Sequence, residues 1–326
     1  MIKNYKEIPL GLYVHWPFCL VKCPYCDFNS HKLTEYNDND WLNAYLFQLD
    51  IVDDFFLKNS LQKNKLSSIF FGGGTPSLMK PFFVENIINK ASKIFGLKNN
   101  IEITLEANPS SVEFTNVSAF KKAGINRLSV GVQSLNDNHL RFLGRLHNFN
   151  DIIKTIEIAF LHFDNVSADL IYGLPNQNLP LWEKELSQFI NNFDFQHISA
   201  YQLTIEKGTK FYHLYKNNKL KIISDKQSLD FYNSTKSILE NNKIFQYEIS
   251  NFAKDGLKCV HNLLYWKSDN WYGIGPGSIS RFWNNLNKRV EIENFKKPET
   301  WLNGILSNRK FFKNLNIVKD NVSNFD

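Results

Sequence analysis

A regular alternation of short apolar segments with longer segments of helical periodicity constrains the fold of this 326-residue chain more than any other feature. Runs of apolar residues predict six buried strands: residues 12–15, 68–71, 101–105, 127–132, 166–171 and 197–203. Helical spacing of apolar residues predicts helices between them: residues 41–56, 84–95, 111–123, 151–163 and 181–192. Because such alternation is typical of parallel sheets, we expect an α/β fold, a partial (β/α)6 barrel of the TIM type. A six-stranded doubly wound sheet is the alternative.

The pattern changes after residue 204. An amphipathic helix is predicted over residues 226–240, followed by a strand-like segment over 245–249 and a stretch rich in glycine and tryptophan. We expect a first domain over residues 1–205 and a smaller α+β domain over residues 206–326. The 43% hydrophobic content is ample for the core of a globular protein.

Three of the four cysteines, Cys19, Cys23 and Cys26, fall within eight positions. A short loop that presents three thiolates can reach three corners of a [4Fe-4S] cube and leave the fourth iron open to a cofactor or substrate. The alternatives are a zinc site with His31 as the fourth ligand, and a disulfide that would leave the third cysteine unpaired. Cys259 is far away and alone, and we expect it to be an ordinary buried thiol.

Polar or very small residues follow several of the predicted strands. Gly72-Gly-Gly-Thr75 follows the second strand, Glu106 and Asn108 follow the third, Gln133 follows the fourth, and Asp169 lies within the fifth. Each of these alone is as typical of a cap or a turn as of a ligand site. Because functional residues of a barrel gather at the carboxyl ends of its strands, we expect these residues to line one pocket.

Charge and composition argue against several classes of protein. The formal net charge of +6 comes from lysines spread along the chain, without the dense basic block typical of nucleic-acid binding. The first residues lack the apolar segment of a signal peptide, and no apolar run reaches the length of about eighteen residues that a membrane span needs. We therefore expect a cytoplasmic protein, since a reducing compartment suits cysteines clustered for metal binding.

Several motifs occur together in a characteristic order: Tyr13-Val-His-Trp-Pro-Phe-Cys19, Gly72-Gly-Gly-Thr-Pro76, Glu106-Ala-Asn-Pro109, Asn126-Arg-Leu-Ser-Val-Gly-Val-Gln-Ser134, Leu143-Gly-Arg145-Leu-His147 and Asp169-Leu-Ile-Tyr-Gly-Leu-Pro175. With the CxxxCxxC loop they resemble the radical S-adenosylmethionine proteins, and in particular the family of oxygen-independent coproporphyrinogen oxidase and its relatives. The resemblance implies that Cys19, Cys23 and Cys26 hold a [4Fe-4S] cluster. It also implies a set of S-adenosylmethionine contacts: Tyr13, Tyr25, Gly73, Gly74, Thr75, Glu106, Gln133, Arg145 and Asp169.

The residues after the third cysteine distinguish two branches of this family. The oxidase carries a further cysteine two positions later, where this chain has Phe28. Cys26-Asp-Phe-Asn-Ser30 and His261-Asn-Leu-Leu-Tyr-Trp266 instead resemble the HemW family of haem chaperones. This resemblance implies a protein without catalytic residues of its own that transfers haem to an acceptor protein, such as one of the respiratory chain. Radical oxidative decarboxylation of coproporphyrinogen III is the alternative function, and a degraded electron-transfer protein is a less favoured third.

A haem contact is predicted at His261, as an axial iron ligand, with Tyr265, Trp266 and Trp271 as flat apolar contacts. The alternative is that His261 forms hydrogen bonds within a strand corner and the aromatic residues belong to the core. Ile279 stands where the family usually has a histidine, and the chain ends sooner than family members usually do. The resemblance leaves a homodimer open and allows at most transient contact with a membrane.

Overall fold

Six parallel strands form the centre of one sheet. The computed structural model describes residues 8–58, 61, 63–109, 116–284, 286, 288–308 and 312–318. The six strands are β1 (Leu10–Trp16), β4 (Leu66–Gly73), β5 (Leu97–Ala107), β6 (Arg127–Gln133), β7 (Val166–Tyr172) and β8 (His197–Gln202). Each pairs in parallel with the next one along the chain. The partial barrel is confirmed, whereas a doubly wound sheet would reverse its strand order at a switch point.

The strands bury alternate side chains on the two surfaces of the sheet. In β1, Leu12 and Val14 are fully buried in the main core, and Tyr13 between them stacks on Phe70 of the neighbouring strand. Side chains of a strand alternate between two faces, so Leu12 and Val14 share the face opposite Tyr13. The outer face of the barrel is therefore apolar, and its inner face carries the polar and aromatic residues of interest.

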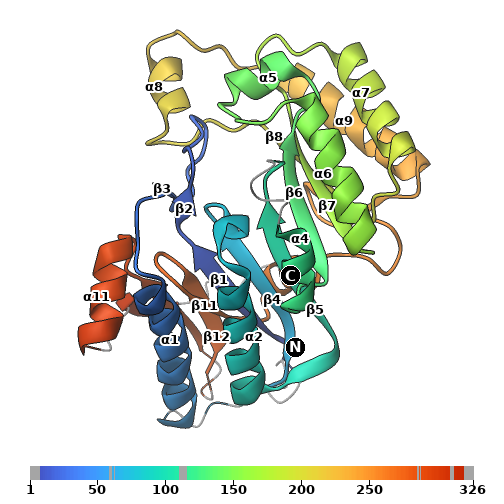
Figure 1. Cartoon of the computed structure of the whole chain (residues 1–326). Coiled ribbons are helices and arrows are strands. Elements are labelled where there is room, and N and C mark those ends of the chain that lie inside the picture. Colours follow the sequence, from blue (N-terminus) through green and yellow to red (C-terminus); the bar gives the residue numbers. More distant parts are fainter. Residues whose placement is uncertain are drawn as a thin grey trace.

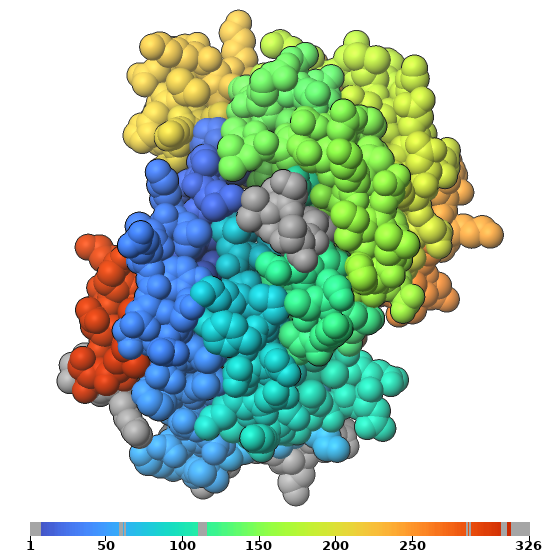
Figure 2. Space-filling model, in the orientation of Figure 1, coloured from blue at the N-terminus to red at the C-terminus, as the bar shows by residue number. Residues whose placement is uncertain are grey.

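Helices cover the outer face of the parallel strands (Figures 1 and 2). They are α1 (Asp38–Lys58), α2 (Pro81–Phe95), α4 (Val117–Lys122), α6 (Phe149–His162), α7 (Leu179–Asn192) and α9 (Asp225–Asn241). Their starts follow local sequence: α6 begins with a capping box between Asn148 and Asp151, and α2 has Pro81 in its first turn. The predicted helix over 111–123 is present as α4, although residues 111–115 lie outside the described residues.

Strands from the last third of the chain extend both edges of the barrel sheet. On the β1 side lie β11 (Asn270–Ile274), β12 (Ile279–Trp283), β13 (Arg289–Asn294) and β14 (Phe312–Val318), and on the β8 side lie β10 (Asn251–Ala253) and β9 (Phe245–Gln246). The strand predicted over 245–249 is thus only two residues long. A further helix, α11 (Pro298–Asn308), packs on α1 (Figure 1). The boundary near residue 205 stays a prediction, but the segments on its two sides share one sheet.

Short elements lie close to the carboxyl ends of the parallel strands: β2 (Phe18–Cys19), β3 (His31–Lys32), the 3-10 helix η2 (Pro76–Leu78), α5 (Asp137–Phe142) and α8 (Lys210–Lys216). A second, smaller apolar cluster centred on Phe211 of α8 packs against Tyr25. Among the described residues, no helix combines the length and apolar character that a membrane span requires.

Candidate functional site

Cys19 is the last residue of β2, and Cys23 and Cys26 lie in the loop between β2 and β3. We call this segment the cysteine loop. β2 pairs in parallel with β3, so that Cys19 lies opposite Lys32. The backbone N–H of Cys26 donates to the carbonyl of Cys23 at 3.2 Å, which places both residues in one tight turn. All three thiols are free and partly exposed, whereas Cys259 is a free but buried thiol, as expected. The loop therefore presents three accessible sulfur atoms at the end of the first barrel strand.

The glycine-rich segment after β4 holds the start of this loop. The N–H of Gly74 donates to the carbonyl of Trp16 at 2.6 Å, and the N–H of Thr75 donates to that of Phe18 at 2.9 Å. Gly73 has a φ of +113°, and a Cβ at this position would lie 2.6 Å from the ring of His15. Only glycine fits there. The triple glycine thus allows two strand ends to approach closely enough for backbone bonding.

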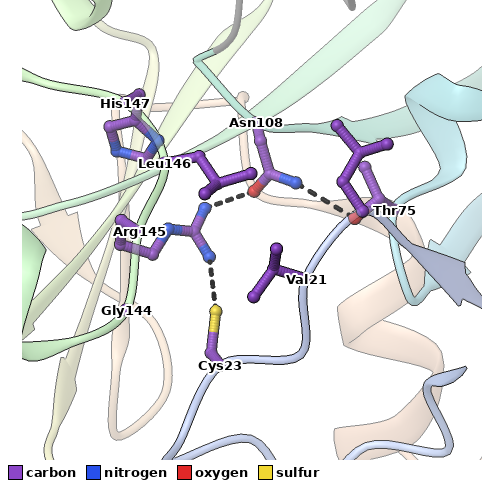
Figure 3. Close-up of a pocket in the computed structure, with 9 residues that line it drawn as sticks. Val21, Cys23, Thr75, Asn108, Gly144, Arg145, Leu146 and His147 are labelled. Carbon is purple, nitrogen blue, oxygen red and sulfur yellow. Dashed lines mark hydrogen bonds between the residues drawn. The ribbon is translucent and has the colours of Figure 1, made fainter. Parts of the chain in front are cut away.

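A chain of polar contacts connects Thr75 with the cysteine loop (Figure 3). Asn108 donates from Nδ2 to Thr75 Oγ1 at 3.1 Å and accepts a hydrogen bond from Arg145 through Oδ1. The guanidinium of Arg145 also donates to the carbonyl of Gly131 at 3.0 Å and to Cys23 Sγ at 3.5 Å. The side chains in this chain of contacts line a pocket, whose walls are Cys23, Thr75, Asn108 and Arg145 together with Leu20, Val21, Gly144, Leu146 and His147. A fixed positive charge therefore stands beside one of the three thiols.

Two half-buried carboxyl groups lie on the inner face of the barrel strands that lead to this pocket. Glu106 accepts a hydrogen bond from the N–H of Gly73 at 3.2 Å, and Asp169 accepts from Ser129 Oγ at 3.1 Å. Burial raises the pKa of Glu106 to about 8, and the nearby charge of Asp169 adds to the rise. Burial likewise raises the pKa of Asp169 above its ordinary value. A cationic ligand group, such as an amine or a sulfonium, would stabilise the ionised carboxylates.

The remaining predicted cofactor contacts lie around the same strand ends. Gln133, at the end of β6, has a φ of +69°, a left-handed backbone that is uncommon for residues other than glycine. Tyr13 donates or accepts a hydrogen bond with His15 Nδ1 at 3.1 Å. Tyr25, in the cysteine loop, packs against the ring of Phe211 at 6.3 Å between centroids. The predicted residues for S-adenosylmethionine thus come from the cysteine loop, from β1, from β4 to β7 and the residues that follow them, and, for Arg145, from the segment between α5 and α6.

The donor set of the loop fits an iron–sulfur cluster. Burial raises the pKa of Cys19 to about 11 and also raises the pKa of Cys26, so their thiolates need a neighbouring cation to form. A bound cluster supplies that positive charge. Among the described residues, no three His, Cys, Asp or Glu side chains converge closely enough to hold one metal ion. A cubane instead accepts one thiolate at each of three separate irons.

His261 does not line this pocket: it lies against Gly11 of β1 and Ser68 of β4, and its ring stacks on that of Tyr13 at 6.1 Å between centroids. It sits on α10 (Val260–Trp266), so the predicted alternative of a strand corner is wrong: the segment is a helix. Its ring is 2% exposed, and its nitrogens are hydrogen-bonded to Ser68 Oγ at 2.8 Å and to the hydroxyl of Tyr265 at 2.9 Å. Burial lowers the pKa of His261 to about 3, which keeps the ring neutral. Its role as a haem ligand stays a prediction, and it requires one of these two bonds to break.

Helix α10 lies inside the barrel and fills its interior near the amino ends of the strands. We call this helix and the residues that it contacts the floor. The residues that it contacts lie near the amino ends of the strands: Gly11 of β1, Ser68 of β4 and Glu102 of β5. Glu102 accepts from the backbone N–H of His261 at 3.2 Å and from the thiol of Cys259 at 3.4 Å. Arg127 of β6 is 2% exposed and lies 4.0 Å from Glu102. The polar groups of the floor bond mainly to one another, although Arg127 Nε has no hydrogen-bond partner among the described residues.

The sequence patterns do not identify two residues at the cysteine end as members of the site. Asn108 was noted only as a polar residue after a strand, yet it connects Thr75 to Arg145. Asn29, in the cysteine loop, donates to the carbonyls of Pro276 and Lys296, which lie 247 and 267 residues further along the chain. The motif Glu106-Ala-Asn-Pro109 was a usable signal for the first, but no local pattern indicated the second.

Comparisons with known proteins agree with this geometry. The model of the Radical SAM superfamily matches residues 13–186. The mitochondrial protein named radical S-adenosyl methionine domain-containing protein 1, from Danio rerio, is 36% identical over 304 residues, covering 92% of this chain and 67% of the relative. Heme chaperone HemW from Haemophilus influenzae is 38% identical over 301 residues, covering 92% of this chain and 77% of the relative.

Among solved structures, coproporphyrinogen III oxidase (HemN) from Escherichia coli, a radical SAM enzyme, matches with a TM-score of 0.77. The match covers 97% of this chain and 74% of that chain at 21% sequence identity, which shows a shared fold. The family model and the relatives agree with the arrangement of residues at the strand ends. The chain belongs to the radical SAM superfamily and, within it, to the HemW family.

Proposed function

We propose that this protein is a haem chaperone, which binds haem and transfers it to an acceptor protein, and that it carries a [4Fe-4S] cluster with exchangeable S-adenosylmethionine. The observation that carries the proposal is the 38% identity with heme chaperone HemW across 92% of this chain. Phe28, in place of the oxidase's additional cysteine, also favours the chaperone. Enzymatic turnover is not part of the proposal.

The cluster end of the barrel would hold the two cofactors. Cys19, Cys23 and Cys26 would ligate three irons of the cluster. When bound, a reduced cluster can supply one electron to the sulfonium of S-adenosylmethionine. The guanidinium of Arg145 suits the cofactor's carboxylate, because planar bidentate pairing with carboxylates is characteristic of arginine.

Other strand-end residues would hold the remaining parts of S-adenosylmethionine. The carboxyl groups of Glu106 and Asp169 suit its amine and ribose hydroxyls. Exposed backbone groups at Gly73, Gly74 and Thr75 can meet the polar amino-acid end, and the rings of Tyr13 and Tyr25 offer apolar contact. Gln133 can bond through its side-chain amide.

Haem could contact the side of α10 that faces outward, because the exposed aromatic residues of the motif at 261–266 lie there. Trp266 is 53% exposed and Tyr265 is 39% exposed. Tyr265 packs edge-on against Trp271 at 4.5 Å between ring centroids, and the indole of Trp271 donates to the carbonyl of the exposed Ile279 at 3.0 Å. Aromatic and aliphatic surface of this kind suits a porphyrin face. His261 is the candidate iron ligand on this helix.

The proposal carries further expectations about setting and partners. The four free cysteines suit a reducing compartment, the cytoplasm. The expected partners are haem and a haem-acceptor protein, such as one of the respiratory chain. We expect no binding to nucleic acid, because the positive charge is spread along the chain.

An anaerobic titration with haemin tests the proposal. Protein with a reconstituted cluster should show a saturable Soret band near one haem per chain, and a haem-free acceptor protein should then withdraw the haem. The same preparation receives S-adenosylmethionine, reductant and coproporphyrinogen III. Decarboxylation without haem binding would replace the chaperone with the alternative function, the oxidase.

A further inference from the structure

The side chain of Asn29 connects the cysteine loop with the edge of the sheet formed late in the chain. Its Nδ2 donates to the carbonyl of Pro276 at 3.0 Å and to the carbonyl of Lys296 at 2.9 Å. Its own backbone carbonyl accepts from His15 Nε2 at 2.9 Å. Asn29 lies three residues after Cys26, so any displacement of the loop also moves these bonds.

The two carbonyls that Asn29 contacts belong to one connected unit. Gly277 N–H donates to the carbonyl of Phe295 at 2.9 Å, and Asn294 Nδ2 donates to the carbonyl of Gly275 at 2.9 Å. This unit comprises residues 275–278, between β11 and β12, and residues 294–296, at the end of β13. We call it the edge turn. Asn29 therefore bonds to both segments of the edge turn at once.

Asn29 also packs closely against the edge turn. A Cβ at Gly277, where φ is +79°, would lie 2.2 Å from Asn29 Nδ2, so a side chain there would displace the amide. The edge turn is also fixed from the other side, because Gln48 of α1 accepts from the N–H of Gly275 at 2.8 Å and from the indole of Trp301 at 3.1 Å. Asn29 is thus a side chain through which the cysteine loop contacts the edge turn, and His31 also bonds to the backbone of Lys296.

A second path runs from Asn29 into the barrel. His15 bonds to Asn29 through Nε2 and to the hydroxyl of Tyr13 through Nδ1 at 3.1 Å. The ring of Tyr13 stacks on the ring of His261 at 6.1 Å between centroids. The cysteine loop is therefore connected to the sheet edge that carries Ile279 and to the helix that carries Tyr265 and Trp266.

We propose that Asn29 is a positioning residue that couples cluster binding in the cysteine loop to the order of the edge turn. A cluster that fixes the loop fixes the amide of Asn29, and the amide then restrains the carbonyls of Pro276 and Lys296. Coupling between two sites is reciprocal, so loss of the Asn29 bonds also weakens retention of the cluster. This inference rests on the proposed cluster at Cys19, Cys23 and Cys26.

Asn29→Asp is the sharpest variant because it preserves the shape of the side chain. Its carboxylate would face two carbonyl oxygens to which the amide donated. Asn29→Ala is the second variant, since it removes the amide without adding charge. Asn242→Asp is the matched control: Asn242 also donates through Nδ2 to a backbone carbonyl, that of Ile238 at 2.8 Å, but on the distant helix α9.

The experiment is hydrogen exchange by mass spectrometry on the full chain, with and without the reconstituted cluster, after iron content has been measured. In the wild type and in Asn242→Asp, the cluster should slow exchange in peptides that cover the edge turn. In both Asn29 variants, protection should persist at residues 18–26 and disappear at the edge turn. Release of iron to a chelator should be roughly tenfold faster, because loss of the Asn29 hydrogen bonds weakens retention of the cluster.

Equal protection of the edge turn in the Asn29 variants and the wild type would overturn the inference, as would a wild type whose cluster leaves the edge turn unaffected. A wild type that takes up no cluster would instead overturn the proposed function. Unchanged exchange in peptides of α6 shows that a variant is folded, so a loss of coupling cannot be confused with general unfolding.

Discussion

The two ends of the barrel are built from the same strands and differ in how their polar groups are satisfied. At the carboxyl ends, thiols are partly exposed, a glycine-rich segment approaches closely, and Arg145 lies beside Cys23. At the amino ends, α10 fills the interior, and His261 is hydrogen-bonded through both ring nitrogens. The first end keeps ionisable groups near a pocket, whereas α10 fills the interior of the second. The difference favours the carboxyl ends for the proposed cluster and S-adenosylmethionine, and it leaves the exposed outer side of α10 for haem.

The pKa shifts of Glu106 and His261 show the same difference between the two ends of the barrel. Glu106 has a pKa raised to about 8, and a cationic ligand would relieve the cost of its ionisation. His261 has a pKa lowered to about 3, and two neutral hydroxyl groups already suit its neutral ring. A perturbed pKa therefore indicates a ligand site only where a partner for the charged form is still missing.

The largest effect is expected from Cys23→Ala. Removing one of the three proposed cluster ligands should abolish the visible absorbance and most of the bound iron after anaerobic reconstitution. Cys259→Ser is the control, because Cys259 lies in the floor and should leave the cluster unchanged. A full cluster in Cys23→Ala would contradict the assignment of the cysteine loop.

His261→Ala tests the floor. It leaves Ser68 and Tyr265 without their shared partner and opens a cavity, so the free energy of unfolding should fall by about 2–4 kcal/mol. The midpoint of denaturant unfolding measures this loss, and iron content per folded chain should remain at the wild-type level. A variant of unchanged stability that loses its cluster would show that the two ends are not distinct.

Asn108→Ala tests the contacts that hold Arg145. The guanidinium loses its bond to Asn108 Oδ1, and the affinity for S-adenosylmethionine should fall roughly tenfold, which corresponds to about 1.4 kcal/mol. Anaerobic calorimetric titration of the reconstituted protein measures the affinity. Asn217→Ala, on the exposed end of α8, is the control. Equal affinities for the two variants would remove Asn108 from the site.

Glu106→Gln should change the pH dependence of stability measured without cofactors. The folded-state pKa of about 8 lies above the ordinary 4.5, so the stabilisation from the protonated acid is complete below pH 4.5 and is lost as the pH rises to 8. The glutamine variant should lack this decline. Identical profiles from pH 4.5 to 8 for the variant and the wild type would show that Glu106 is not held in its neutral form.

Much of this fold could be predicted from the sequence because its signals are local. Apolar runs located β1, β4 and β6 to within a few residues, and the CxxxCxxC spacing located the cysteine loop. Long-range features gave no such signal. Nothing near residue 270 indicates that β11 pairs with β1, or that a helix around His261 enters the barrel. The bonds of Asn29 join residues more than 240 positions apart, so only the folded chain reveals them.

We expect the cysteine end to hold a cluster with one open iron that accepts S-adenosylmethionine. Electron paramagnetic resonance of the anaerobically reconstituted and reduced protein, before and after S-adenosylmethionine is added, measures this binding. About four irons per chain and a cluster signal that shifts when the cofactor is added are expected. A cluster signal that is unchanged by saturating S-adenosylmethionine, or a chain that binds zinc in place of iron, would contradict this expectation.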